Sequence, residues 1–185
     1  PKGKPGKTAI LFGTNSCNPI VYQGDSLRLR GCVNDVSTAR ALAIAHEYHD
    51  IYVFTDADAT IGNFLDTWAT VKSKLTEGDN MLVFRSGHGM SIDENLLDKD
   101  KEGKGTNTDG SVYTGDQGAV LYDGVIIDDV YWRLLLGLPK VKVVWLNDSC
   151  HSATQYRLMS GIKTGNSYRK PKSISKAYLP APDNV

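Results

Sequence analysis

Short apolar segments alternate along the chain with longer segments of mixed character. The apolar segments cover residues 8–13, 51–54, 81–84 and 141–146. Runs of this length, rich in Val, Ile, Leu and Phe, are typical of buried β-strands. The pattern therefore predicts four strands, separated by segments that are long enough to hold helices.

Three of the intervening segments have apolar residues at helical spacing. The first helix can be capped by Asn34 or Asp35 and extends to about Tyr48. The second follows Thr60 as its cap, and the third covers about residues 129–136, before Gly137 and Pro139. The apolar faces predicted for the first two helices are Val36, Ala39, Leu42, Ala43 and His46, and Ile61, Phe64, Leu65, Trp68, Val71 and Leu75.

This alternation predicts the fold class. Strand and helix follow one another, and right-handed crossovers between such elements give a mostly parallel sheet with helices on both faces. We therefore expect an α/β protein, a three-layer αβα sandwich with a mostly parallel central sheet. In sheets of this kind a functional site lies beyond the carboxyl ends of the strands.

The composition gives no sign that the protein binds nucleic acid or membranes. The 185 residues are 41% hydrophobic, and 21 basic residues balance 21 acidic ones, so no global charge favours nucleic acid or an anionic membrane as partner. The sequence shows no membrane-spanning run or secretion signal, and three cysteines fit a reducing compartment, so we expect a cytoplasmic protein. We expect a flexible arm at residues 1–7, a catalytic domain at 8–160 and a basic linker or tail at 161–185.

Two chemically reactive residues follow two of the predicted strands. His88 lies in Ser86-Gly87-His88-Gly89, after the third strand, and Cys150 lies in Asp148-Ser149-Cys150-His151, after the fourth. A thiol needs a nearby imidazole to form the nucleophilic thiolate at neutral pH. The pairing predicts Cys150 as a nucleophile and His88 as its base. The N–H groups of Gly89 and Cys150 are candidate donors to an oxyanion.

These motifs, together with Gly31-Cys32-Val33-Asn34-Asp35, resemble the motifs of metacaspases, within the wider caspase-like cysteine peptidases. The resemblance covers about Thr8 to Tyr156, with the motifs in the family's order. It implies a caspase–haemoglobinase fold and a Cys–His dyad that cleaves peptide bonds. It also implies that His151 is a neighbour of the nucleophile and not its base. Cys17 lies outside the matching motifs and is interpreted as structural.

The resemblance also locates a pocket for the substrate residue before the cut. Its matching positions carry Cys32, Asp35, Ser86 and Asp148, where caspases carry arginines that select aspartate. Two carboxylates favour a basic residue, and Arg in particular through bidentate hydrogen bonds. We therefore expect polypeptide substrates cut after Arg or Lys. The alternative for Asp35 is a cap of its helix, which is compatible with the pocket role.

Acidic residues that follow His88 predict a calcium site. Ca²⁺ prefers several oxygen ligands, often carboxylates. In calcium-dependent metacaspases, carboxylates equivalent to Asp116, Asp128 and Asp129 form the site, whereas the position of a fourth acidic ligand carries Arg157 here. The alternative is that Asp128 and Asp129 only stabilise the N-terminus of the third helix.

The basic cluster at Arg169, Lys170, Lys172 and Lys176 offers sites that an Arg/Lys-specific enzyme could cut in itself. The chain would then be the large fragment of a self-cleaved zymogen, with its own C-terminal fragment as a partner. The alternatives are a catalytically silent caspase-like interaction module and a nucleotide- or flavin-binding domain. A nucleotide-binding domain would need a glycine-rich phosphate loop after the first strand, and this sequence has none.

Overall fold

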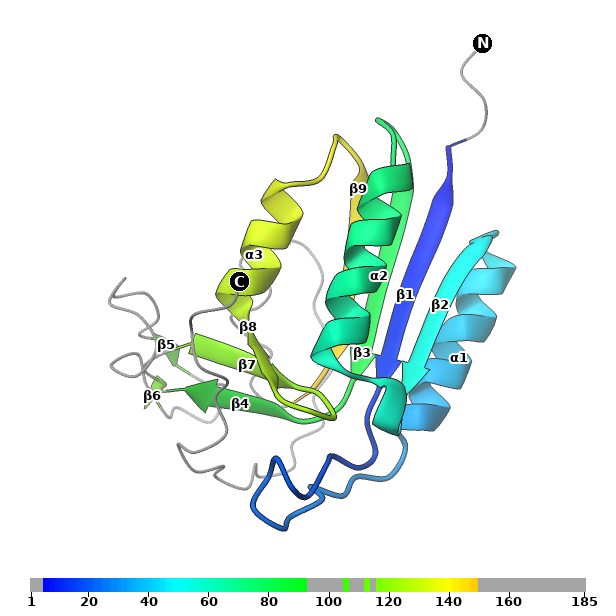
Figure 1. The fold of residues 1–185 in the computed structure, drawn as a ribbon. Helices are drawn as coiled ribbons and strands as arrows, with labels where there is room; N and C mark the ends of the chain where they lie inside the picture. Colours follow the sequence, from blue (N-terminus) through cyan, green and yellow to red (C-terminus); the bar gives the residue numbers. More distant parts are fainter. Residues whose placement is uncertain (1–4, 93–104, 107–111, 114–115, 150–185) are drawn as a thin grey trace.

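The computed structural model describes residues 5–92, 105–106, 112–113 and 116–149. Within these residues the central sheet contains β1 (Lys7–Gly13), β2 (Asp50–Thr55), β3 (Asn80–Ser86) and β9 (Lys142–Asp148). The strands are parallel in the order β2-β1-β3-β9, so all of their carboxyl ends meet at one edge (Figure 1). Each of the four predicted strands is present.

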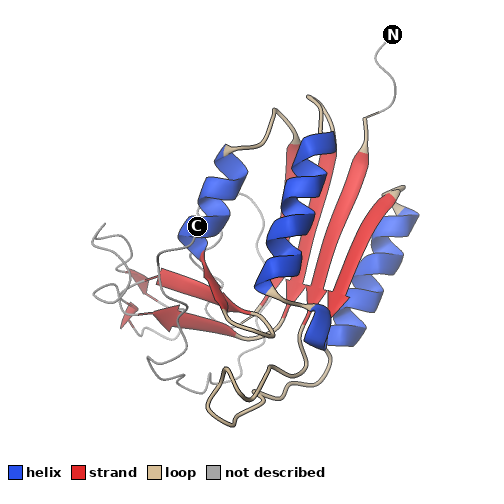
Figure 2. Cartoon of the chain, viewed as in Figure 1, coloured by secondary structure: helices blue, strands red, loops and turns tan. Residues whose placement is uncertain are grey.

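Helices cover both faces of this sheet (Figure 2). Helix α1 (Cys32–Ala45) packs on one face, and α2 (Ile61–Lys74) and α3 (Asp128–Leu136) lie over the other, with a short 3-10 helix, η1 (Asp56–Asp58), before α2. The prediction of an αβα sandwich with a mostly parallel sheet is confirmed.

The alternation of side chains along β1 divides the core into two layers. Ile10 and Phe12 face α2 and α3, where they join a cluster that includes the aromatic residues Phe64, Trp68, Tyr131 and Trp145. Ala9 and Leu11 face α1, where small residues of the helix allow close packing. Both faces of β1 are therefore fully buried, as expected for a central parallel strand.

The start and the inner face of α1 differ from the prediction. The helix begins at Cys32 with Gly31 as its N-cap at φ 115°, and Oδ1 of Asn15, from the preceding loop, accepts the N–H of Cys32 at 2.9 Å. Asp35 therefore lies in the first turn and is not the cap. Leu42 is 56% exposed and His46 is exposed, so their assignment to the inner face was wrong. The buried positions are Cys32, Val36, Ala39 and Ala43, a narrow stripe that leaves Leu42 on the far side.

Helix α2 begins as its sequence predicts. The Thr60 side chain accepts a hydrogen bond from the N–H of Asn63 at 3.1 Å. Asp123, from the turn before β8, accepts the N–H of Ile61 at 2.8 Å. These two side chains satisfy amide groups that a helix start leaves without partners in the helix.

A smaller antiparallel sheet adjoins the carboxyl ends of the central strands and was not predicted. It pairs β4 (Gly89–Ile92) with β7 (Asp116–Val120), and β7 with β8 (Val125–Ile127). A further short pair joins β5 (Gly105–Thr106) to β6 (Val112–Tyr113). Helix α3 follows β8 directly, so this sheet connects the strand ends to the α2–α3 layer (Figure 1).

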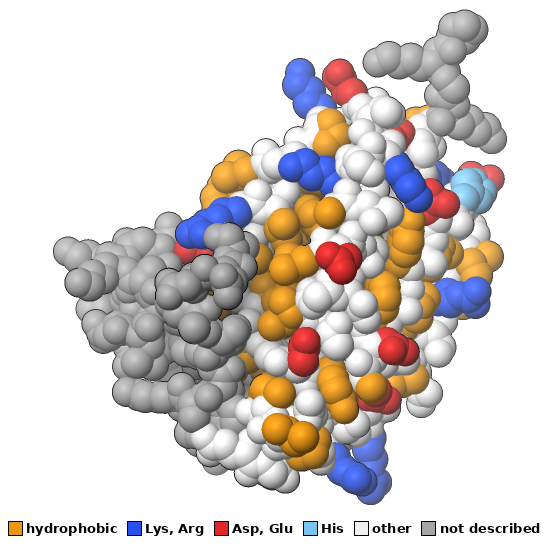
Figure 3. All heavy atoms as spheres, in the orientation of Figure 1, with side chains coloured by type: hydrophobic (Ala, Val, Ile, Leu, Met, Phe, Trp, Pro, Cys, Tyr) orange, Lys and Arg blue, Asp and Glu red, His pale blue; other side chains and the backbone are white. Residues whose placement is uncertain are grey.

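The surface carries charge of both signs. On the face formed by α2 and α3, acidic and basic side chains are scattered among apolar ones (Figure 3). Among the described residues no helix combines the length and the apolar character that crossing a membrane requires.

Candidate active site

The two strands that precede His88 and Cys150 are neighbours in register. Ser86 at the end of β3 pairs with Asp148 at the end of β9, and the N–H of Gly87 donates to the carbonyl of Asp148 at 3.2 Å. His88 follows Ser86 by two residues, and Cys150 follows Asp148 by two. The described chain ends at Ser149, directly before Cys150. Both chain segments therefore leave the sheet side by side at the same level.

The imidazole of His88 is half-buried and has a defined partner. Its Nε2 atom lies 3.0 Å from the carbonyl oxygen of Leu27. A carbonyl only accepts hydrogen bonds, so Nε2 must carry the hydrogen. In the neutral ring the lone pair then resides on Nδ1, which makes Nδ1 the basic nitrogen. This contact fixes both the ring's orientation and its tautomer.

Leu27 belongs to the loop between β1 and α1, and the prediction of site residues missed it. Leu27 is 6% exposed and has φ 47°, and its N–H donates to the carboxylate of Asp25 at 2.9 Å. The hydroxyl of Tyr22 lies 2.7 Å from the carbonyl oxygens of Leu121 and Gly124, which anchors the loop to the turn between β7 and β8. Burial is the main cause of the raised pKa of Tyr22.

A backbone carbonyl leaves no direct trace in a sequence. The available signal was the set of apolar residues in an otherwise polar loop. Cys17, Tyr22 and Leu27 form a buried cluster with Val120 and Val125 of the small sheet. Burial also raises the pKa of the Cys17 thiol to about 12, so this cysteine is a packed, unreactive group.

The residues expected to bind the substrate's basic side chain lie together beside His88. The hydroxyl of Ser86 donates to Oδ2 of Asp35 at 2.9 Å, so the position-35 carboxylate faces the strand end and not its own helix start. The thiol of Cys32 is buried at the first residue of α1. Burial raises the pKa of Cys32, and the carboxylates of Asp35 and Asp148 add to the shift. The structure thus brings Cys32, Asp35, Ser86 and Asp148 to one place.

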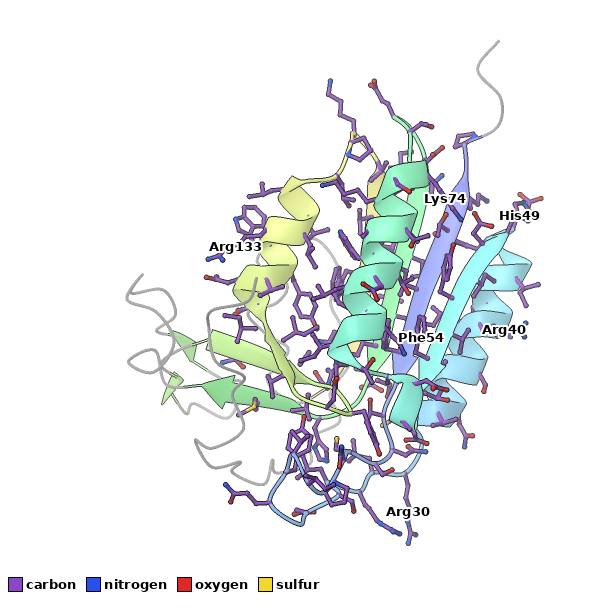
Figure 4. All side chains as sticks on the ribbon, in the orientation of Figure 1. Arg30, Arg40, His49, Phe54, Lys74 and Arg133 are labelled. Atoms are coloured by element: carbon purple, nitrogen blue, oxygen red, sulfur yellow. The ribbon has the colours of Figure 1, made fainter. Side chains whose placement is uncertain are left out.

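Close packing holds α1 against this edge. A Cβ atom added to Gly13, at the end of β1, would lie 2.5 Å from Cγ2 of Val36 and 2.7 Å from the carbonyl oxygen of Cys32. The first turn of α1 therefore contacts the strand backbone directly. Figure 4 shows Arg30 at this end of the molecule, whereas His49 and Lys74 lie at the opposite end.

The acidic residues expected to bind calcium occupy one end of the small sheet. Strand β7 begins at Asp116, and β8 runs into α3 at Asp128. Oδ1 of Asp128 accepts the N–H of Gln117 at 3.2 Å, which brings the two chain segments together. Asp129 forms a long ion pair with Arg133 at 3.9 Å. The Asp116 side chain lies outside the described part of the structure, and within that part no three His, Cys, Asp or Glu side chains come together as a metal site would require.

Several predicted features lie outside the described residues. These are the nucleophile Cys150 and its oxyanion N–H, together with His151, Arg157 and the basic tail.

Comparisons with known proteins identify the fold and the family. The model for the metacaspase, peptidase C14 domain, matches residues 7–159. Metacaspase-1 of Scheffersomyces stipitis is 26% identical over 181 residues, and Metacaspase-1 of Ajellomyces capsulatus is 28% identical over 182. Each alignment covers 92% of this chain but only 42% and 47% of the relative, so the chain spans less than half of their length.

Protein GSU0716 from Geobacter sulfurreducens is a solved structure with a similar fold. It has a TM-score of 0.66 and 26% identity, and the match covers 79% of this chain and 51% of that one. The parallel sheet covered by helices, together with the family match, places the chain among caspase-like proteins. Within that class, the match over most of its length shows that this chain belongs to the metacaspase family of C14 cysteine peptidases.

Proposed function

We propose that this protein is a cysteine endopeptidase that cleaves polypeptides after Arg or Lys, with Cys150 as nucleophile and His88 as base. The observation that carries the proposal is the register of β3 and β9. Ser86 pairs with Asp148, so the segments that lead to His88 and to Cys150 leave the sheet from paired residues. The contact between Leu27 and the Nε2 atom of His88 supports Nδ1 as the basic nitrogen of the ring.

The reaction follows from these groups. Nδ1 of His88 takes the proton of the Cys150 thiol, and the thiolate sulfur attacks the substrate carbonyl carbon. The N–H groups of Gly89 and Cys150 are the proposed donors to the resulting oxyanion. The C–N bond then breaks as the imidazolium returns its proton to the leaving amine. Water, deprotonated by His88, hydrolyses the thioester and releases the acid and the free thiol.

Charge supports the preference for a basic residue. Asp35 accepts a hydrogen bond from Ser86, and Ser86 pairs with Asp148 across β3 and β9, so two acidic residues are associated with the paired strand ends. A guanidinium entering this region gains charge-assisted hydrogen bonds that a neutral or acidic side chain cannot form.

A panel of fluorogenic peptides tests the proposal. Peptides with Arg, Lys, norleucine or Asp before the cleaved bond are compared for wild type and Cys150→Ala. Cleavage of the Arg and Lys peptides, lost in Cys150→Ala, supports it. Cleavage of Asp peptides alone refutes the specificity. If the folded protein cleaves none of them, the silent interaction module is favoured instead.

We further propose that Asp116, Asp128 and Asp129 bind Ca²⁺, which would supply positive charge that holds β7 and α3 together. The oxygen donor set suits this ion, and the juxtaposition of the two segments supports the site. Calorimetry with Ca²⁺ tests it on wild type, Asp128→Asn and, as control, Asp66→Asn on the exposed side of α2. Binding that is lost only in Asp128→Asn supports the site, and absence of binding to wild type refutes it.

The basic tail is proposed as a substrate of the same site. Intact-mass analysis of the wild type beside Cys150→Ala tests this. Cleavage among Arg169 to Lys176 in the wild type alone indicates self-processing, whereas identical masses refute it.

A further inference from the structure

Arg85 is a buried cation in the strand that leads to His88. The residue is only 5% exposed. Burying a guanidinium is costly unless hydrogen bonds replace its hydration. The hydrogen bonds that offset this cost therefore indicate the role of Arg85 in the protein.

The guanidinium connects three separate segments. One terminal nitrogen donates to Oδ1 of Asn147 at 3.0 Å, in β9. The other donates to the carbonyl oxygen of Val120 at 2.7 Å, at the end of β7, and to the carbonyl oxygen of His88. A planar fork of donors can serve several acceptors in this way, whereas a lysine ammonium acts as a single point.

These contacts reach the main chain of the His88 segment and side chains of the segment that leads to Cys150. The N–H of Val120 also donates to the His88 carbonyl at 3.0 Å, so that carbonyl is fixed from two directions. On the other side, Oδ1 of Asn147 accepts the hydroxyl of Ser149 at 3.2 Å, and Ser149 directly precedes Cys150. A continuous chain of hydrogen bonds thus runs from the base's backbone to the residue before the nucleophile.

A glycine makes room for this arrangement. A Cβ atom at Gly87 would lie 3.1 Å from a terminal nitrogen of Arg85. That distance is tight for a side chain, so the glycine allows the guanidinium to lie directly against the loop that carries His88.

We propose that Arg85 is a positioning residue for the Cys–His pair, holding the His88 backbone at a fixed place relative to β7 and the end of β9. This inference rests on the proposed peptidase function, because Arg85 would act on the reaction only through the position of His88. Small displacements of a catalytic group are costly, and about 1 Å can lower the rate 100-fold. Loss of Arg85 should therefore lower kcat and leave KM nearly unchanged.

The experiment compares Arg85→Met, Arg85→Lys and the wild type on an Arg peptide. Arg40→Met and Arg40→Lys are matched controls, since Arg40 is exposed on the outer face of α1 (Figure 4). We expect kcat to fall about 10- to 100-fold in Arg85→Met. We expect partial recovery in Arg85→Lys, because an ammonium can reach some of the carbonyls but cannot span to Asn147 as well. The Arg40 variants should match the wild type.

A second readout does not depend on peptide cleavage. Amide hydrogen exchange at Val120 reports whether the His88 carbonyl is still held, and exchange at Leu11 in the central strand β1 reports the global fold. Faster exchange at Val120 with unchanged exchange at Leu11 supports the positioning role. Equal acceleration at both amides in Arg85→Met and in Arg85→Lys indicates a purely structural role and overturns it.

The two proposals fail in distinguishable ways. If the wild type cleaves the peptide and Arg85→Met retains its kcat, the positioning role is wrong while the peptidase function stands. If the wild type cleaves nothing but Val120 exchange accelerates selectively in Arg85→Met, the peptidase function is wrong while the structural anchoring of the His88 loop stands. Should Arg85→Met fail to fold, the same comparisons are made with Arg85→Lys.

Discussion

Replacing Asp35 by Asn isolates the charge of the proposed specificity pocket. Asn can still accept the hydrogen bond that Ser86 now donates to Asp35 at 2.9 Å, so the local packing is retained. What disappears is one of two negative charges available to a substrate guanidinium. A hydrogen bond to a charged group contributes about 1.5–3 kcal/mol. Since about 1.4 kcal/mol corresponds to a factor of ten, the expected effect is roughly 10- to 150-fold.

The assay measures kcat/KM for two peptides that differ only in having Arg or citrulline before the cleaved bond. Citrulline has the shape of Arg without its charge, so the ratio of the two values measures recognition of charge. We expect this ratio to fall roughly 10- to 150-fold in Asp35→Asn. Thermal stability should change little, because the bond to Ser86 remains.

Asp66→Asn is the matched control, since Asp66 is exposed on α2, which covers the sheet face opposite α1. Its Arg/citrulline ratio should equal that of the wild type. An Asp35→Asn protein that folds normally and keeps the wild-type ratio refutes the role of Asp35 in specificity. An equal loss in both variants attributes the effect to long-range charge instead.

Three further changes test the scaffold. Thr60→Ala removes the acceptor for the N–H of Asn63 and should lower the free energy of unfolding by about 1 kcal/mol, measured by denaturant titration; no change refutes the cap. Gly13→Ala would place a Cβ 2.7 Å from the carbonyl oxygen of Cys32, so α1 must shift and both stability and kcat/KM should fall; wild-type values contradict this contact. Iodoacetamide at neutral pH should spare Cys17 in the folded protein, because burial raises its pKa to about 12 and the reactive thiolate forms only as pH rises toward that value; rapid alkylation, mapped by mass spectrometry, contradicts its burial.

The fold could be predicted because the local sequence preferences of most segments agree with the structure that they adopt. The apolar runs became β1, β2, β3 and β9, and Thr60 caps α2 as expected. The start of α1 could not be read in the same way, because Asp35 is a good capping residue type. Its carboxylate instead accepts a hydrogen bond from Ser86, a residue 51 positions later in the chain. The Asp35 side chain could either cap its helix or bind a distant residue, and the tertiary contact with Ser86 determines which of the two occurs.

The candidate site was predictable only in its side-chain chemistry. Motifs identified His88, and register places it beside the segment that leads to Cys150. The carbonyl of Leu27 could not be predicted, because every residue has such a group and only the loop conformation selects this one. The role of Arg85 was equally hidden, since its main partners include backbone oxygens of β7 and the His88 loop.

Labelling with an arginyl chloromethyl ketone tests the central claim most directly. The reagent carries the proposed basic recognition element and alkylates an activated thiol. We expect a single adduct on Cys150, located by peptide mapping, with Cys17 and Cys32 unmodified and with labelling slowed strongly in His88→Ala. A folded protein whose Cys150 stays unmodified, or is labelled equally fast without His88, would contradict it.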